Sequence, residues 1–152
     1  MKRETEDCCQ MFLTPAASAA TAAAVIITKV KDGRNMRNRP QFGVHLDICN
    51  IVNSPERFWN TTALIDDVFD RLGEMIVSCH AKDLRWEVER NMHFVECPCG
   101  EGNVDWAEML RRLAALPADV PLMIEHMPGE EEYLRSRDHL KKLAAENGIE
   151  TF

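Results

Sequence analysis

Three mostly apolar runs in the second half of the chain each lead into a polar side chain. The runs and the residues that follow them are 42–46 with Asp47, 76–79 with His80, and 121–124 with Glu125. Apolar runs of this length are typical of strands buried in a sheet. Stretches of helical periodicity separate them, and strands joined by helical crossovers run parallel. The chain is therefore predicted to fold as an α/β protein.

The helical segments are marked by apolar faces and by signals at their ends. The predicted helices are one that follows Ser54-Pro55 and stops at Gly73, one capped by Asp105 and Glu108 that ends before Pro117, and one from 130–132 that closes at Asn147-Gly148. The expected buried faces are Leu64, Ile65, Val68, Phe69 and Leu72 in the first helix, and Trp106, Met109, Leu110 and Leu113 in the second. The segment 81–102 is expected to be a long polar loop.

The N-terminal region is less regular. Residues 8–13 form at best a short strand, and the Ala-rich segment 14–31 favours a helix through its alanines but a strand through its β-branched run 25–28. Residues 32–40 are expected to be a polar loop. The predicted organisation is a single domain over 1–152, with a divergent N-terminal segment 1–39.

Composition narrows the class of protein. A chain of 152 residues that is 45% hydrophobic and 28% charged is suited to one soluble globular domain with its own core. No apolar run is long enough to span a membrane, and the N-terminus lacks the apolar stretch of a signal peptide, so a cytoplasmic protein is expected. The net charge of -7 disfavours binding to nucleic acid.

The six cysteines are interpreted as reduced structural thiols. Cys49 and Cys79 lie in or beside apolar runs, where a free thiol behaves as a small hydrophobic side chain. Cys97 and Cys99 are separated by one proline, which is tighter than the usual zinc spacing, and no second pair accompanies them. A redox or zinc role for these two is the alternative.

The polar residues at the strand ends suggest a common site. In α/β folds the ligand site lies beyond the carboxyl ends of the strands, so Asp47, His80 and Glu125 are expected at one rim. Two carboxylates there would repel each other unless a cation lies between them. Mixed oxygen and nitrogen ligands fit Mn²⁺, Mg²⁺, Co²⁺ or Zn²⁺. The pattern alone supports an alternative equally well, in which the three polar residues end their strands without sharing a function.

Four motifs carry a resemblance to a known family. They are FGVHLDICNIVNSP, IVSCHAKDL, the GEGNVDW run over 100–106, and PLMIEHM. In order and spacing they resemble the xylose-isomerase-like TIM-barrel superfamily, and specifically its sugar-phosphate isomerase/epimerase branch. The resemblance covers about 40–147 and implies that 40–152 is the C-terminal half of such a barrel.

The resemblance implies a metal-dependent proton transfer on a sugar or sugar phosphate through an enediolate. The family's metal-binding Asp, His and Glu match Asp47, His80 and Glu125, and Glu125 would also act as a catalytic base. Lys82, Asp83 and His93 are the candidate substrate-binding residues.

Several positions around this set have a second interpretation. Lys82 and Asp83 are equally well explained as a solvated pair at the start of a loop. His45 is expected to pack structurally, and His126 is expected to line the mouth of the site.

The sequence also departs from the family pattern. Gln10 lies about where the family has its first catalytic glutamate, and an amide cannot act as a base. A complete barrel needs roughly 250 residues, so the chain is expected to supply about half of one. The expectations are then a truncated chain that lacks an N-terminal half, a homo-oligomer, or an N-terminal segment that folds over the open sheet.

Two alternatives to a sugar isomerase or epimerase follow from this departure. The first is a non-catalytic half-barrel that keeps the scaffold and metal binding. The second is a relative of apurinic-site endonucleases, which is less favoured because Asn50 replaces a histidine of that branch.

Overall fold

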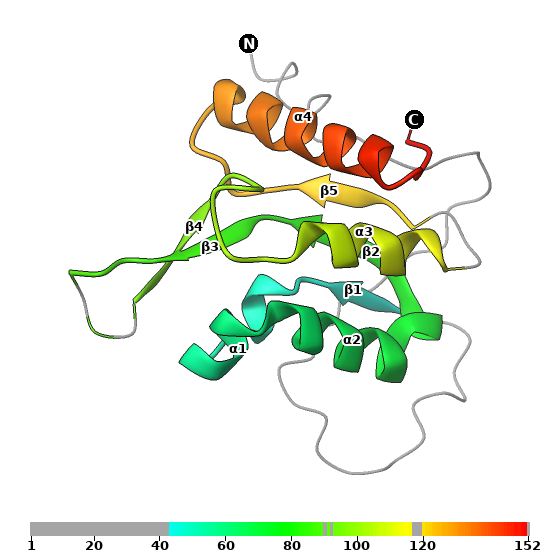
Figure 1. The fold of residues 1–152 in the computed structure, drawn as a ribbon, viewed down its shortest axis with the longest axis horizontal. Coiled ribbons are helices and arrows are strands. Elements are labelled where there is room, and N and C mark those ends of the chain that lie inside the picture. The colour runs from blue at the N-terminus through cyan, green and yellow to red at the C-terminus, as the bar shows by residue number, and fades with distance from the viewer. Residues whose placement is uncertain (1–42, 90, 92, 117–119, 152) are drawn as a thin grey trace.

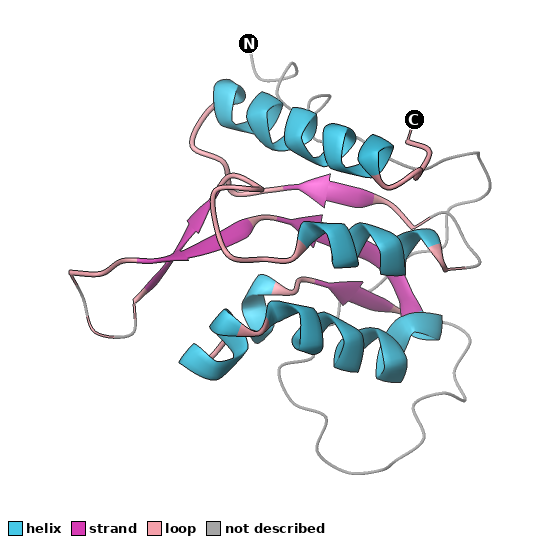
Figure 2. Ribbon diagram, viewed as in Figure 1, coloured by secondary structure: helices cyan, strands magenta, loops and turns pink. Residues whose placement is uncertain are grey.

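The computed structural model describes residues 43–151 except 90, 92 and 117–119. Its helices and strands are β1 (Val44–Leu46), α1 (Pro55–Trp59), α2 (Thr61–Leu72), β2 (Ile76–Ala81), β3 (Asp83–Trp86), β4 (Phe94–Cys97), α3 (Trp106–Ala114), β5 (Leu122–Ile124) and α4 (Glu130–Glu146) (Figures 1 and 2). Two 3₁₀ turns, Cys49–Ile51 and Gly73–Met75, follow β1 and α2. The predictions for 8–13, Gln10 and 14–31 lie outside the described residues.

The main sheet is parallel and has the order β1-β2-β5. Neighbouring strands in the sheet follow one another along the chain, with α2 between β1 and β2 and α3 before β5. Helix α3 packs against α2 on one side and α4 on the other, so the helices form one layer over the sheet (Figure 1). This is the single winding of a TIM barrel, and within the described residues the sheet does not close.

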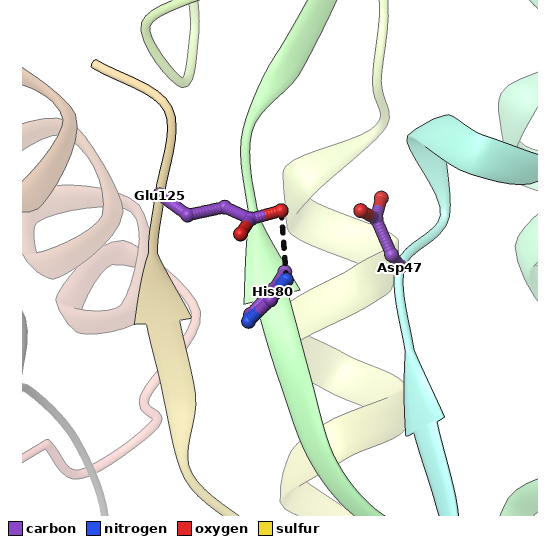
Figure 3. Close-up of side chains that lie close together, drawn as sticks. All are labelled: Asp47, His80 and Glu125. Atoms are coloured by element: carbon purple, nitrogen blue, oxygen red, sulfur yellow. Dashed lines mark ion pairs between the residues drawn. The ribbon is translucent and has the colours of Figure 1, made fainter. Parts of the chain in front are cut away.

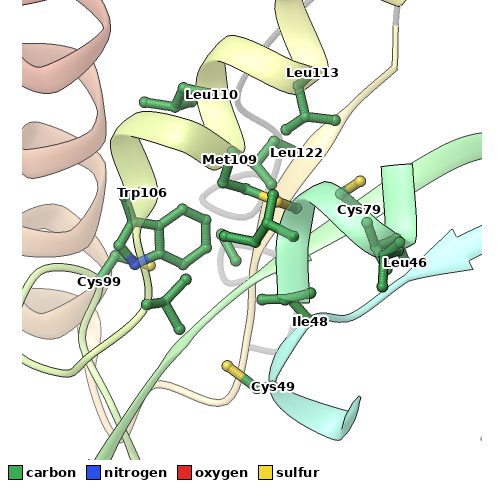
Figure 4. Close-up of a cluster of buried hydrophobic side chains, with 14 of the residues drawn as sticks. Leu46, Ile48, Cys49, Cys79, Cys99, Trp106, Met109, Leu110, Leu113 and Leu122 are labelled. Atoms are coloured by element: carbon green, nitrogen blue, oxygen red, sulfur yellow. The ribbon is translucent and has the colours of Figure 1, made fainter. Parts of the chain in front are cut away.

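The two faces of this sheet differ because side chains alternate along a strand. One face packs against the helices and is buried, with Leu46, Cys79 and Leu122 each at most 2% exposed. These three join a core that includes Trp106, Met109, Leu110 and Leu113 of α3 (Figure 4). The other face presents the partly exposed side chains of His45, Ser78, His80 and Met123. In a closed barrel this second face lines the interior.

The buried faces predicted for the first two helices are confirmed, except that Leu72 is only partly buried. In α3 the buried residues are the four that periodicity selected, and Asp105 accepts a hydrogen bond from the Glu108 N–H. The reverse half of the predicted capping box is replaced, since the Asp105 N–H donates to Thr61 Oγ1 at 3.1 Å. Helix α2 ends at Leu72, immediately before the predicted stop at Gly73.

The predicted first helix is divided in two. Asn60 adopts a non-helical conformation with φ −136° and ψ 55°, which separates α1 from α2. The Phe58 carbonyl beside the break accepts a hydrogen bond from the Asn103 side-chain amide. A long-range partner thus satisfies a backbone group that a continuous helix would have paired, and no local pattern signals this.

The prediction of a polar loop over 81–102 is wrong in part. Strands β3 and β4 pair antiparallel there and form a hairpin that projects from the carboxyl end of the sheet (Figure 1). Trp86 and Phe94 lie opposite each other in register, and both rings contact Phe58 of α1. Cross-strand aromatic contacts of this kind stabilise a hairpin. Each strand has only four residues, which is too short for a clear alternating pattern.

The four described cysteines, Cys49, Cys79, Cys97 and Cys99, are free and buried, as predicted for structural thiols. Burial raises the pKa of Cys97 to about 12, which suppresses the reactive thiolate. In the part of the chain that the structure describes, no helix is long and apolar enough to cross a membrane.

Candidate functional site

The structure brings Asp47, His80 and Glu125 together at the carboxyl edge of the main sheet (Figure 3). One potential ligand atom from each of the three lies within 4.8 Å of the others. His80 Nδ1 is 2.7 Å from Glu125 Oε1, and Asp47 faces this pair from β1. The group spans the three neighbouring strands of the main sheet, so residues far apart in sequence form one cluster.

Strand periodicity explains this placement. His45 and Asp47 are two residues apart, as are Met123 and Glu125, and residues two apart point to the same face of a strand. His80 pairs in register with Met123, which puts its imidazole on that same face. All three therefore point away from the helices and toward the side that would be a barrel interior.

Lys82 lies in the middle of the carboxylates. Its Nζ is 3.0 Å from Asp47 Oδ2, 3.0 Å from Glu125 Oε1 and 2.8 Å from Glu96 Oε1. The residue is 2% exposed, so the alternative of a solvated pair at a loop start is wrong for Lys82. A buried ammonium needs such partners, since an unpaired charge in the interior is strongly unfavourable.

The charges of this cluster reinforce one another. Burial lowers the pKa of Lys82, but the carboxylates of Glu96, Asp47 and Glu125 outweigh it and raise the pKa above its usual range. Burial raises the pKa of Glu125, and Lys82 and His80 more than offset this and lower it. The pKa of Glu96 is lowered for the same reason, by Lys82 and His126 against burial. The Lys82 ammonium and the carboxylates of Glu125 and Glu96 are therefore charged at neutral pH.

Sequence reasoning missed Glu96, which reaches the cluster from β4. Its neighbour in the site is His126, whose Nδ1 lies 2.9 Å from Glu96 Oε2 and 3.3 Å from Lys82 Nζ. Lys82 can only donate and an ionised Glu96 can only accept, so Nδ1 makes one of these two hydrogen bonds at a time. Glu96 could have been found only by predicting β4, the four-residue strand that contains it.

His126 lies at the mouth, with its side chain 58% exposed. Its φ of 58° is in the left-handed region, where it is the one described residue other than glycine with positive φ. Such a conformation costs about 1 kcal/mol or more outside glycine and is found disproportionately at functional sites. In this conformation the imidazole lies beside Glu96 and Lys82.

Asp83 is buried, so the solvated alternative is wrong for it as well, and its surroundings assign it a structural role. It is 0% exposed, and four donors approach its carboxylate. Oδ1 accepts from the backbone N–H of Leu84 and Val104, and Oδ2 from the Gly100 N–H and from Trp106 Nε1, all at 2.8 to 3.1 Å. With both oxygens committed, Asp83 supports the turn before α3 and is not positioned for the substrate contact predicted for it.

The other two predicted histidines have different surroundings. His93, a predicted substrate-binding residue, begins the returning arm of the hairpin and lies 3.4 Å from Glu87 Oε2; it is not part of the described Asp47, His80 and Glu125 group. His45 packs edge-on against the His80 ring, with centroids 3.9 Å apart, and its Nδ1 is 2.6 Å from Ser78 Oγ. Burial, then His80, lowers the pKa of His45.

The chemistry of the site fits a divalent cation. Two carboxylates and one imidazole are the mixed oxygen and nitrogen ligands that such ions accept. Asp47 Oδ2 is buried and makes no aligned hydrogen bond, although it forms the ion pair with Lys82. Among the described residues, no other group of three such side chains is close enough to share an ion. The four described cysteines are therefore not part of any candidate metal site there.

The comparison with protein families agrees with the fold. The model of the xylose isomerase-like TIM barrel family matches residues 7–143, and the chain belongs to this family. The match begins well before residue 40, where the sequence motifs first show the resemblance. A comparison with curated proteins gives no match.

Proposed function

We propose that the protein is a divalent-metal-dependent isomerase or epimerase that moves a proton on a small sugar or sugar phosphate. One observation carries the proposal: Asp47, His80 and Glu125 meet at the carboxyl edge of a xylose isomerase-like sheet. This is the edge at which α/β barrels of this type place their active sites.

Asp47, His80 and Glu125 would hold the metal. The metal, when bound, would polarise the carbonyl and neighbouring hydroxyl of the substrate and so acidify the adjacent C–H. The neighbouring residues would hold the side chains of the site in place. The His45 ring, packed on His80, restricts the orientation of that imidazole, and the carboxylate of Glu125 is fixed by His80 and Lys82.

Glu125 is proposed as the catalytic base. Its lowered pKa keeps it ionised at neutral pH, so it can accept the proton that the substrate loses. Its Oε1 faces His80 and Lys82, while His126 Nε2 lies 3.6 Å from its Oε2. Lys82, between the carboxylates, is better placed to balance charge than to contact a substrate.

The alternative is a scaffold that keeps the site without turnover. One observation favours it: Lys82 already pairs with two of the three proposed ligands. A relative of the apurinic-site endonucleases is less favoured because the net charge of -7 opposes binding to DNA. We expect no shift of an abasic duplex at low salt.

Metal binding tests the site directly. We expect chelator-stripped protein to take up Mn²⁺ and His80→Ala to lose at least about tenfold in affinity, measured by isothermal titration calorimetry. His93→Ala is the matched control, because it removes an imidazole outside the cluster and should leave the Mn²⁺ affinity unchanged. Equal affinities in the wild type and both variants would remove the metal site from the proposal.

Turnover separates the enzyme from the scaffold. In a screen of aldose–ketose interconversion with sugars and sugar phosphates, we expect activity in the Mn²⁺-loaded protein and a loss of at least about 100-fold in Glu125→Gln. Retained Mn²⁺ binding with no turnover of any substrate in the wild type would favour the scaffold.

A further inference from the structure

The proposed site contains more negative charge than the three predicted ligands account for. Glu96 adds a third carboxylate to those of Asp47 and Glu125, and all three lie within 3.0 Å of Lys82 Nζ. One ammonium against three carboxylates leaves two negative charges. That remainder is the charge that a divalent cation would neutralise.

We propose that Lys82 is a resident counter-cation of the site. In the metal-free protein it pairs with Asp47 and Glu125, and it yields both carboxylates to the divalent metal while it keeps Glu96. The inference rests on the proposed metal site and adds to it a residue that sets the affinity of that site.

The position of Glu96 makes this exchange feasible. Glu96 comes from β4 of the hairpin and is not one of the three clustered ligands, so its carboxylate stays available to Lys82 when the others are taken. His126 holds it from the other side, at 2.9 Å. Lys82 is 2% exposed, so it changes partners inside the protein without carrying its charge through a solvent-exposed state.

Competition for the same oxygens also explains the geometry. Glu125 Oε1 is at once 3.0 Å from Lys82 Nζ and 2.7 Å from His80 Nδ1, and this imidazole nitrogen is itself a potential metal ligand. Asp47 Oδ2 is buried and has Lys82 as its ion-pair partner. The ammonium therefore stands at the atoms that the metal needs.

The first test removes the ammonium. In Lys82→Met the metal has no competitor and meets an additional uncompensated charge, so we expect Mn²⁺ to bind at least about tenfold more tightly, measured by titration calorimetry. Thermal unfolding should show a lower midpoint for the metal-free variant and a larger rise on adding Mn²⁺ than in the wild type. Unchanged or weaker Mn²⁺ binding by folded Lys82→Met would overturn the inference.

The second test keeps Lys82 and removes its remaining partner. In Glu96→Gln the ammonium has only Asp47 and Glu125, so we expect Mn²⁺ to bind about fivefold more weakly. In the Lys82→Met background the same substitution should weaken binding by a clearly smaller factor, because only the direct attraction between the Glu96 carboxylate and the cation is then lost. Equal effects in the two backgrounds would show that Glu96 does not act through Lys82 and would overturn the exchange.

Failure of this inference is distinguishable from failure of the proposed function. His80→Ala reports on the metal site alone: if it abolishes binding while Lys82→Met has no effect, the metal site stands and the counter-cation falls. If the wild type binds no Mn²⁺ but Lys82→Met does, Lys82 blocks the site without yielding it, which overturns both the exchange and the proposed metal-dependent function. Should Lys82→Met not fold, Glu96→Gln decides: affinity equal to that of the wild type overturns the inference.

Discussion

Two buried charges stand side by side in the chain and have opposite surroundings. Asp83 is surrounded by four N–H donors, none of them from a charged group, and each of its oxygens accepts two hydrogen bonds. Lys82 is surrounded by three carboxylates, more than one ammonium can neutralise. We call these the Asp83 anchor and the Lys82 cluster. The first is complete within the protein, and the second has charge left over.

The difference indicates which of two buried polar groups serves the fold and which serves a ligand. A fully satisfied network rigidifies the structure, and any change to it leaves groups without partners. The Asp83 anchor ties the start of β3 to the turn before α3. Unbalanced buried charge destabilises a fold. The surplus of carboxylates in the Lys82 cluster therefore supports the proposal that this cluster binds a ligand.

The largest effect is expected from breaking the anchor. In Asp83→Asn one oxygen becomes an amide that faces two N–H donors, so the free energy of unfolding should fall by about 3–5 kcal/mol. Urea unfolding followed by circular dichroism measures this, and Mn²⁺ should not restore the loss. Asp138→Asn, at an exposed position, is the control and should change stability by less than about 0.5 kcal/mol. A loss that Mn²⁺ reverses would assign Asp83 to the metal site instead.

A smaller effect is expected from crowding the anchor. A Cβ on Gly102 would lie 2.3 Å from Asp83 Oδ1 and 2.4 Å from the Leu84 carbonyl oxygen, so Gly102→Ala should cost about 1–3 kcal/mol. At Gly73 the nearest side-chain atom is 3.6 Å away and φ is −48°, so Gly73→Ala should be neutral or stabilising by up to about 1 kcal/mol. Similar melting temperatures for the two variants would mean that the turn yields easily.

The pH dependence of stability should reveal the contribution of the Lys82 cluster. Lys82 holds the folded-state pKa of Glu125 and Glu96 below their ordinary value of 4.5, so their stabilisation is present above pH 4.5 and is lost as pH falls through the folded-state pKa. Stability should thus decline below pH 4.5 in the metal-free wild type, and decline less in Lys82→Met, where the group that lowers both pKa values most is gone. Unfolding free energies at several pH values between 3 and 6 test this, and parallel curves would contradict it.

The smallest effect is expected where neither cluster is touched. The ion pair of His93 and Glu87 on the hairpin is about half exposed, and exposed pairs contribute little. His93→Ala should change the unfolding free energy by less than about 0.5 kcal/mol. A larger change would show that the hairpin depends on this pair as much as on the contacts of Trp86 and Phe94.

Periodicity predicted the elements that pack on the core. The apolar faces of α2 and α3 and the strands of the main sheet were all identifiable, because each repeats a buried position over several turns or ends at a polar residue. The meeting of Asp47, His80 and Glu125 followed from topology alone, since carboxyl ends of parallel strands share one edge. Their role in binding a metal stays a prediction.

The features that could not be predicted from the sequence depend on long-range partners. Asn60 breaks a helix beside a carbonyl that Asn103 binds, and Glu96 reaches Lys82 only because the hairpin forms. The burial of Lys82 and Asp83 was hidden for the same reason: their neighbours in sequence are ordinary, and the groups that surround them lie elsewhere in the chain. Local propensity carries no record of such contacts.

The hairpin is an appendage to the parallel sheet, and this makes the third carboxylate of the site adjustable. Glu96 faces Lys82 only in the present alignment of β3 with β4, where it pairs with Leu84. Sliding that alignment by one position would turn the carboxylate to the opposite side, whereas a slide of two would restore its orientation with a different neighbour. The electrostatics of the site can therefore change with the register of the hairpin, without any change in the strands of the parallel sheet.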